Sequence, residues 1–194
     1  MGNDTSNGYD DCADAYSAAR SDNGLSIIQN WTSKLPRGAS VLDVGCGTGL
    51  PVTRALIDAG LTVSAIDASH NMVAKFQQNC PSIKVSCEDA ETGSALGQKY
   101  DAIIAIGLIF LLPEDRQAPL LSRMCSSLKM GGRLLFTAPS QRCKWVDVLT
   151  GQSSTSLGAA RYRALLAEAD LKIISEYDDE GESHYYDARK ISEL

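Results

Sequence analysis

The sequence is short of histidine, aromatic residues and long apolar runs, and these shortages exclude several classes of protein. Only 2 of the 194 residues are histidine, and 6% are aromatic. The 6 cysteines include no C-x-x-C pair and no histidine partner at zinc spacing, so we expect no metal site and free thiols in a reducing compartment. No apolar run approaches the ~18 residues that a membrane span needs, so we expect no span.

Positive charge is scarce as well. The net charge is −6, whereas a surface for nucleic acid needs a basic face, so we expect no nucleic-acid partner. The chain begins with polar residues, which argues against a secretory signal and favours the cytoplasm. Gly2 and Ser6 match the short pattern for myristoylation, and the sequence leaves open whether Gly2 is modified. The length fits a single domain over residues 1–194, as a monomer or a homodimer.

The most informative stretch is residues 40–50. An apolar run with β-branched residues stops there at Gly45, Gly47 and Gly49, and a helical pattern follows. This order predicts a strand, a tight turn and a helix whose first N–H groups face a polar ligand. Asp67 follows the next apolar run, at the place where a doubly wound sheet sets a carboxylate on ribose hydroxyls. The stretch therefore predicts a site for a nucleoside-containing ligand.

The glycine spacing is G-x-G-x-G, and Asp43 stands two residues before the first glycine. This resembles the first motif of the class I S-adenosylmethionine-dependent methyltransferases, D/E-x-G-x-G-x-G. The resemblance implies S-adenosylmethionine as cofactor and S-adenosylhomocysteine as product, with Met72 beside the adenine. It also implies that Asp89, or else Glu88, accepts a hydrogen bond from the adenine amine. Core packing of Met72 and a solvated acidic turn at Asp89 stay open as alternatives. The implied cofactor-binding residues are Tyr16, Asp43, Gly45, Cys46, Gly47, Gly49, Asp67, Ala68, Met72, Asp89, Ala90 and Ile106.

Hydrophobic periodicity predicts an α/β fold. Two-sided apolar runs typical of buried parallel strands alternate with helical stripes, and the last two runs flank a D-D-E-G turn. We expect a doubly wound, seven-stranded, mostly parallel sheet with a C-terminal antiparallel hairpin, the topology that the resemblance also implies. Ser69 is expected to cap the helix that carries Met72. The expected strands are 41–44, 62–66, 83–87, 100–106, 133–137, 171–177 and 183–188.

Two segments are expected to cover the site. Residues 1–23 are polar but contain Tyr9 and Tyr16, in a Y-D…A-x-x-Y pattern that resembles a segment folding over the cofactor in small methyltransferases. The alternative is a disordered tail. Residues 140–156 have weak periodicity and follow the fifth strand, at the edge where such sheets bind ligands. Because long loops in compact domains are usually functional or disordered, we interpret this segment as an irregular cover over the acceptor.

The acceptor site is expected where the apolar loop 107–113 meets these segments. The loop lacks the N-P-P-Y or D-P-P-Y string of enzymes that methylate nucleic acid or protein glutamine, which counts against those substrates. His184 and Asp147 are the candidates for a general base; the alternatives are edge-strand packing for His184 and a solvated loop acid for Asp147. The expected substrate-binding residues are Leu108, Phe110, Trp145 and Tyr186.

The sequence predicts methyl transfer from S-adenosylmethionine to a small-molecule acceptor, through oxygen, nitrogen or sulfur. The reaction is an in-line displacement in which the protein mainly orients the reactants, and a base is needed only if the acceptor must lose a proton. One alternative is a non-catalytic protein that binds S-adenosylmethionine or S-adenosylhomocysteine, since no base is assured. A second is an NAD-type oxidoreductase, which the glycine spacing disfavours.

Overall fold

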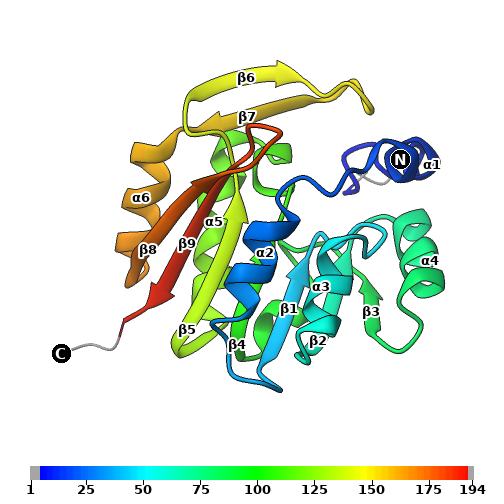
Figure 1. Cartoon of the computed structure of the whole chain (residues 1–194). Helices are drawn as coiled ribbons and strands as arrows, with labels where there is room; N and C mark the ends of the chain where they lie inside the picture. The colour runs from blue at the N-terminus through cyan, green and yellow to red at the C-terminus, as the bar shows by residue number, and fades with distance from the viewer. Residues whose placement is uncertain (1–4, 192–194) are drawn as a thin grey trace.

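The computed structural model describes residues 5–191, so Gly2 lies outside the described residues. Its main feature is a seven-stranded sheet of order β3-β2-β1-β4-β5-β9-β8 (Figure 1). Strands β1 to β5 pair in parallel, and β9 runs antiparallel to β5 and β8. The predicted fold class is confirmed. The strands of this sheet are β1 (Ser40–Val44), β2 (Thr62–Asp67), β3 (Lys84–Cys87), β4 (Tyr100–Ala105), β5 (Leu128–Thr137), β8 (Leu171–Asp178) and β9 (His184–Lys190).

Helices cover both faces of the sheet, which is why the central strands are apolar on both sides. Along β4, Ala102 and Ile104 pack with the cluster under α2 and α3, whereas Ile103 and Ala105 pack with the cluster under α5 and α6. Figure 1 shows α2 and α3 in front of the sheet. The helices are α1 (Ala13–Ala19), α2 (Leu25–Thr32), α3 (Val52–Asp58), α4 (His70–Asn79), α5 (Glu114–Ser126) and α6 (Ala159–Glu168), with the 3₁₀ turns η1 (Ala95–Gly97) and η2 (Ile109–Leu111).

The strand order reverses at β1, which lies between β2 and β4. In open α/β sheets, ligands bind outside the carboxyl ends of the strands at such a switch point. The loops that follow β1, β2, β3 and β4 therefore meet at one edge of the sheet.

Residues 140–156 differ from the irregular cover that we expected. They form most of a separate two-stranded antiparallel hairpin of β6 (Arg142–Val146) and β7 (Ser153–Leu157). Figure 1 shows the hairpin and α1 at the end of the sheet to which β1 and β5 point. The hairpin escaped detection because the polar run of β7 lacks the apolar alternation by which a strand is recognised.

Most predicted boundaries agree with the structure to within one or two residues, and β5 is the exception. It begins at Leu128 rather than at residue 133, because its first residues extend beside Tyr100 instead of ending the preceding helix. Within residues 5–191, none of the helices combines the length and the apolar character that crossing a membrane requires.

Candidate active site

A cavity of about 610 Å³ lies at the switch point, where the loops after β1 to β4 meet the N-terminal segment and the β6–β7 hairpin. It brings together residues from every segment that the sequence singled out except the C-terminal hairpin. The predicted site residues that line it are Tyr16, Gly45, Gly47, Asp67, Ala68, Met72, Asp89, Ala90, Ile106, Leu108, Phe110, Trp145 and Asp147.

The glycine loop after β1 needs glycine for two different reasons. At Gly47, where φ is +53°, an added Cβ would lie 3.3 Å from the hydroxyl of Tyr16, so the N-terminal segment closes onto this part of the loop. At Gly49, where φ is +80°, a Cβ would lie 2.9 Å from the ring of Phe76 in α4. Gly47 keeps the cavity open because it has no side chain, and Gly49 lets the loop pack against α4.

Asp67 ends β2 and joins the loop to the following helix. One carboxylate oxygen accepts a hydrogen bond from the amide of Gly47 at 2.8 Å, and the other accepts one from the amide of Ser69 at 2.9 Å. Burial raises the pKa of Asp67, while these two hydrogen bonds act to lower it. Each carboxylate oxygen has a further lone pair for a ligand hydroxyl.

Ser69 positions Met72, as predicted. The hydroxyl of Ser69 accepts a hydrogen bond from the amide of Met72 at 3.0 Å, which caps α4. The same hydroxyl donates to the carboxylate of Asp10 at 2.7 Å, so the N-terminal segment is tied to the start of this helix. Met72 is buried and lines the cavity.

Asp89 and Glu88 both line the cavity, but they differ in what is left for a ligand. The two carboxylate oxygens of Glu88 accept hydrogen bonds from the amides of Ser94 and Ala95. Oδ1 of Asp89 accepts one from the amide of Glu91 at 2.7 Å. Asp89 therefore keeps more acceptor capacity than Glu88 and remains the candidate that accepts a hydrogen bond from the adenine amine.

Asp43 lies beneath the glycine loop and does not line the cavity. Its side chain is 1% exposed and accepts a hydrogen bond from the hydroxyl of Thr53 in α3 at 2.6 Å. Its direct role in the structure is to hold α3 against the loop. Cys46 and Gly49 likewise lie outside the cavity lining, in contact with the α4 side of the core.

Asp43 is expected to make the stability of the protein depend on pH. Burial raises the pKa of Asp43 from 3.8 to about 7, although the hydroxyl of Thr53 acts to lower it. Because the folded-state pKa lies above the unfolded value, the folded protein is destabilised as the pH rises from 3.8 to about 7. Between pH 5.5 and pH 8 the cost should be about 2 kcal/mol. Urea unfolding at the two pH values should show this extra loss in the wild type and not in Asp43→Asn; identical pH dependence of the two proteins would contradict it.

The far end of the cavity is built by the N-terminal segment, η2 and β6. The hydroxyl of Tyr9 donates to Oδ2 of Asp147 at 3.0 Å and joins the N-terminal segment to the hairpin. The ring centroids of Phe110 and Trp145 are 5.3 Å apart, and those of Tyr9 and Tyr16 are 5.8 Å apart. This end is therefore walled by aromatic rings around a single carboxylate.

Arg20 is a site residue that the sequence interpretation missed. It lines the cavity, and its guanidinium lies 5.7 Å from the centroid of the Tyr16 ring. Its Nε is buried and has no hydrogen-bond partner among the described residues. A buried donor without a partner is costly, so a ligand anion is the natural complement. The spacing Tyr16-x-x-x-Arg20, in which positions i and i+4 are neighbours on a helix, was the available signal.

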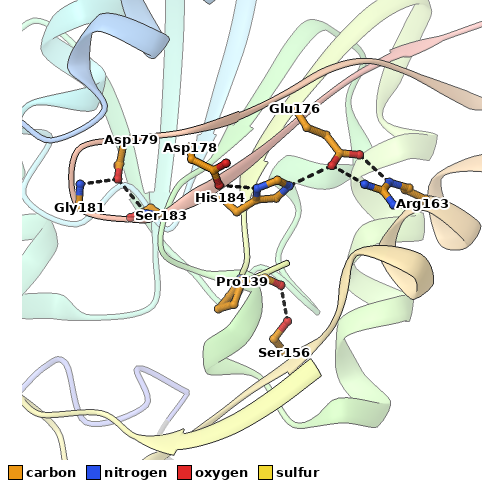
Figure 2. A network of polar contacts seen from close by, with 9 residues as sticks. All are labelled: Pro139, Ser156, Arg163, Glu176, Asp178, Asp179, Gly181, Ser183 and His184. Atoms are coloured by element: carbon orange, nitrogen blue, oxygen red, sulfur yellow. Dashed lines mark hydrogen bonds and ion pairs between the residues drawn. The ribbon is translucent and has the colours of Figure 1, made fainter. Parts of the chain in front are cut away.

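His184 and Tyr186 do not line the cavity, which corrects their predicted placement at the acceptor. The two ring nitrogens of His184 lie 2.7 Å from Asp178 and 3.0 Å from Glu176, both in β8 (Figure 2). Glu176 also pairs with Arg163 of α6. Tyr186 is fully buried, and its ring stacks on Phe136 at 4.8 Å. Asp178 and Glu176 of β8 hold the ring of His184, and Tyr186 packs on Phe136. His184 and Tyr186 therefore both stabilise the C-terminal hairpin.

The chain is similar to known methyltransferases. Residues 41–132 match the family described as methyltransferase domain. The ubiquinone biosynthesis O-methyltransferase of Coxiella burnetii is 31% identical over 112 residues, which are 56% of this chain and 47% of that protein. The chain thus spans about half the length of this curated relative.

Two solved structures share the fold. The CcbJ methyltransferase of Streptomyces caelestis superimposes with a TM-score of 0.80 over 98% of this chain and 100% of that one, at 16% identity. The magnesium protoporphyrin IX methyltransferase of Synechocystis with bound SAM gives a TM-score of 0.67 over 94% of this chain and 80% of that one, at 20% identity. At such identities the likeness concerns the fold.

Proposed function

Because the sequence match and the fold together identify a class I S-adenosylmethionine-dependent methyltransferase domain, we propose that this chain methylates a small-molecule acceptor. The observation that carries the proposal is the single cavity at the switch point. One end has the glycine loop and Asp67, and the other is an apolar and aromatic chamber. A cofactor and an acceptor would therefore lie side by side in one cavity, as an in-line displacement requires.

The residues at the glycine-loop end fit S-adenosylmethionine, which supplies an electrophilic methyl group when bound. Asp67 has acceptor capacity for the ribose hydroxyls, and Asp89 has it for the adenine amine. The buried Nε of Arg20, which has no hydrogen-bond partner within residues 5–191, complements the carboxylate of the amino-acid part. The Gly47 backbone leaves room that a side chain would fill. The chain's own contribution is to orient the two reactants and to exclude water from the aromatic end.

A small molecule is the acceptor class that the cavity and the relatives favour. The names of two relatives refer to ubiquinone and to magnesium protoporphyrin IX, which are small molecules, whereas the name of a third refers to ribosomal protein L11. Leu108, Phe110 and Trp145 give the apolar wall that is usual in such sites. This proposal does not choose among oxygen, nitrogen and sulfur as the acceptor atom.

We propose that the chain is one domain. In it, residues 1–23 cover the cofactor and residues 140–156 cover the acceptor. Tyr16 lies over the glycine loop, and Tyr9 packs on Tyr16 and donates a hydrogen bond to Asp147 beside the hairpin. We further propose that the protein acts as a monomer or homodimer without nucleic acid. Its six free cysteines favour the cytoplasm.

Deleting residues 1–20 is expected to weaken binding of S-adenosylhomocysteine at least ~10-fold while the sheet stays folded. The deletion removes Tyr16 and Arg20 from the cavity and the Tyr9 hydrogen bond to Asp147. Loss of one charged hydrogen bond alone weakens binding by about 1.5–3 kcal/mol. Calorimetry gives the affinity, and circular dichroism checks the fold. Equal affinities of the truncated and full-length proteins would show that the segment does not cover the cofactor.

Transfer of label from methyl-labelled S-adenosylmethionine to a fractionated metabolite extract tests the activity itself. The proposal expects a labelled small molecule that depends on active protein. Binding of S-adenosylhomocysteine with no labelled product in any extract would favour the non-catalytic alternative instead.

A further inference from the structure

The groups that face the acceptor end of the cavity indicate which acceptor atom the site suits. Among the described residues that line the cavity there is no histidine, lysine or cysteine. Each lining carboxylate other than Asp147 already has at least one partner within the protein. Asp67, Glu88 and Asp89 accept backbone hydrogen bonds, and Glu91 pairs with Arg116 at 2.5 Å. The remaining carboxylate is Asp147, and it is the one at the aromatic end.

Asp147 is poorly suited to remove a proton. Its Oδ1 accepts hydrogen bonds from the amides of Leu149 and Thr150, both at 2.9 Å, and its Oδ2 accepts one from Tyr9. Burial acts to raise the pKa of Asp147, but these hydrogen bonds outweigh it and hold the pKa below its ordinary value. Asp147 is therefore a fixed anion at neutral pH. An alcohol acceptor would find no base there.

A fixed anion among aromatic faces is an environment for a cation. Tyr9, Phe110 and Trp145 line the same end of the cavity as Asp147. Trp145 lies in β6 and Asp147 directly follows its last residue, Val146, and both side chains line the cavity. Aromatic faces attract ammonium groups, and quaternary ammonium ligands are recognised in this way. A thiolate or carboxylate acceptor would instead be repelled by Asp147.

We propose that the acceptor atom is an uncharged amine nitrogen, methylated at the end of the cavity formed by Tyr9, Phe110, Trp145 and Asp147. The inference rests on the proposed function. The nitrogen lone pair forms the new bond to the methyl carbon, and the electron pair of the broken bond stays on sulfur. Positive charge thus moves from sulfur to nitrogen, where Asp147 and the rings stabilise it. An amine that arrives protonated must first lose its proton to water, because its lone pair forms the new bond. The product of a primary or secondary amine loses its proton to water as well.

Arg20 and Arg116 are the basic residues among the described cavity lining, and neither neutralises Asp147 at the aromatic end. Arg116 is neutralised by Glu91 and is half exposed. Arg20 lies at the Tyr16 ring, beside the glycine loop. Neither is paired with Asp147 among the described contacts.

The test uses three soluble molecules of nearly the same shape: choline, 3,3-dimethylbutan-1-ol and 3,3-dimethylbutanoate. They are titrated calorimetrically into the complex of the full-length protein with S-adenosylhomocysteine. We expect choline to bind at least ~10-fold more tightly than the neutral alcohol, and the anion to bind most weakly. Asp147→Asn and Trp145→Ala should each reduce the preference for choline. Val148→Ser is the matched control, because Val148 lies in the same hairpin and is 96% exposed.

Each outcome decides between the two proposals. If S-adenosylhomocysteine binds but choline binds no better than the alcohol, or does not bind, the amine inference is overturned and the proposed function stands. A preference that survives both substitutions overturns it as well. If S-adenosylhomocysteine itself does not bind, the proposed function is contradicted and the inference falls with it.

Discussion

Replacing Asp67 by alanine is expected to weaken binding of S-adenosylhomocysteine by about 2–4 kcal/mol, because two charge-assisted hydrogen bonds to the ribose hydroxyls are lost. The carboxylate also holds the amides of Gly47 and Ser69, at 2.8 and 2.9 Å. The substitution would therefore remove both the proposed ligand contact and the link between the glycine loop and α4. Calorimetric titration of the two proteins measures the difference.

Two further variants separate these contributions. Asp67→Asn keeps one acceptor oxygen and loses the charge, so its affinity should lie between those of the wild type and Asp67→Ala. Asp101 lies near the amino end of β4, opposite the carboxyl end that faces the cavity, and pairs with Lys129 at 2.9 Å, so Asp101→Ala should leave the affinity unchanged. An unchanged dissociation constant for Asp67→Ala would show that Asp67 does not bind the ligand.

Replacing Asp187 by alanine is expected to destabilise the fold by about 3–5 kcal/mol, the usual cost of leaving a buried charge without its partner. Asp187 is fully buried in β9 and pairs with Arg133 of β5, which is 9% exposed. Its other oxygen accepts a hydrogen bond from the indole of Trp31 in α2 at 3.2 Å. The carboxylate thus joins the C-terminal hairpin, the central sheet and a covering helix.

Urea unfolding measures this effect, and Asp178→Ala on the same hairpin is its control. The side chain of Asp178 is 71% exposed, and exposed ion pairs contribute about 0–1 kcal/mol. Replacing the buried pair together, as Arg133→Met with Asp187→Leu, should recover most of the stability, because no charge is then left alone. A loss of less than about 1 kcal/mol for Asp187→Ala would show that the pair does not support the hairpin.

The sheet could be predicted because its strands are buried on both faces and so are written as apolar runs. The run at Tyr100 and the glycines after β1 each identify one element without reference to the rest of the chain. The β6–β7 hairpin could not be predicted in this way. Its second strand is S-S-T-S-L, and four of these residues are buried by the surrounding structure rather than by their own hydrophobicity.

The glycine-loop end of the cavity could be placed in the fold for the same reason: it is built from short local patterns at strand ends. Asp67 and Met72 follow directly from a strand and a helix cap. Arg20 could not be predicted with equal ease, because its position depends on the N-terminal segment folding back onto the loop. The alternation that puts His184 and Tyr186 on one face was right, since their rings lie 4.8 Å apart. Alternation along one strand does not say whether its residues reach the cavity, and these two do not.

The measurement that tests the account most directly is a calorimetric titration of the full-length protein with S-adenosylhomocysteine and, separately, with NAD. Both ligands carry adenosine, so only the rest of the molecule distinguishes them. The G-x-G-x-G spacing favours the former, because dinucleotide sites have the spacing G-x-G-x-x-G. We predict saturable one-to-one binding of S-adenosylhomocysteine and no detectable binding of NAD. Binding of NAD, or no binding of S-adenosylhomocysteine, would contradict the account.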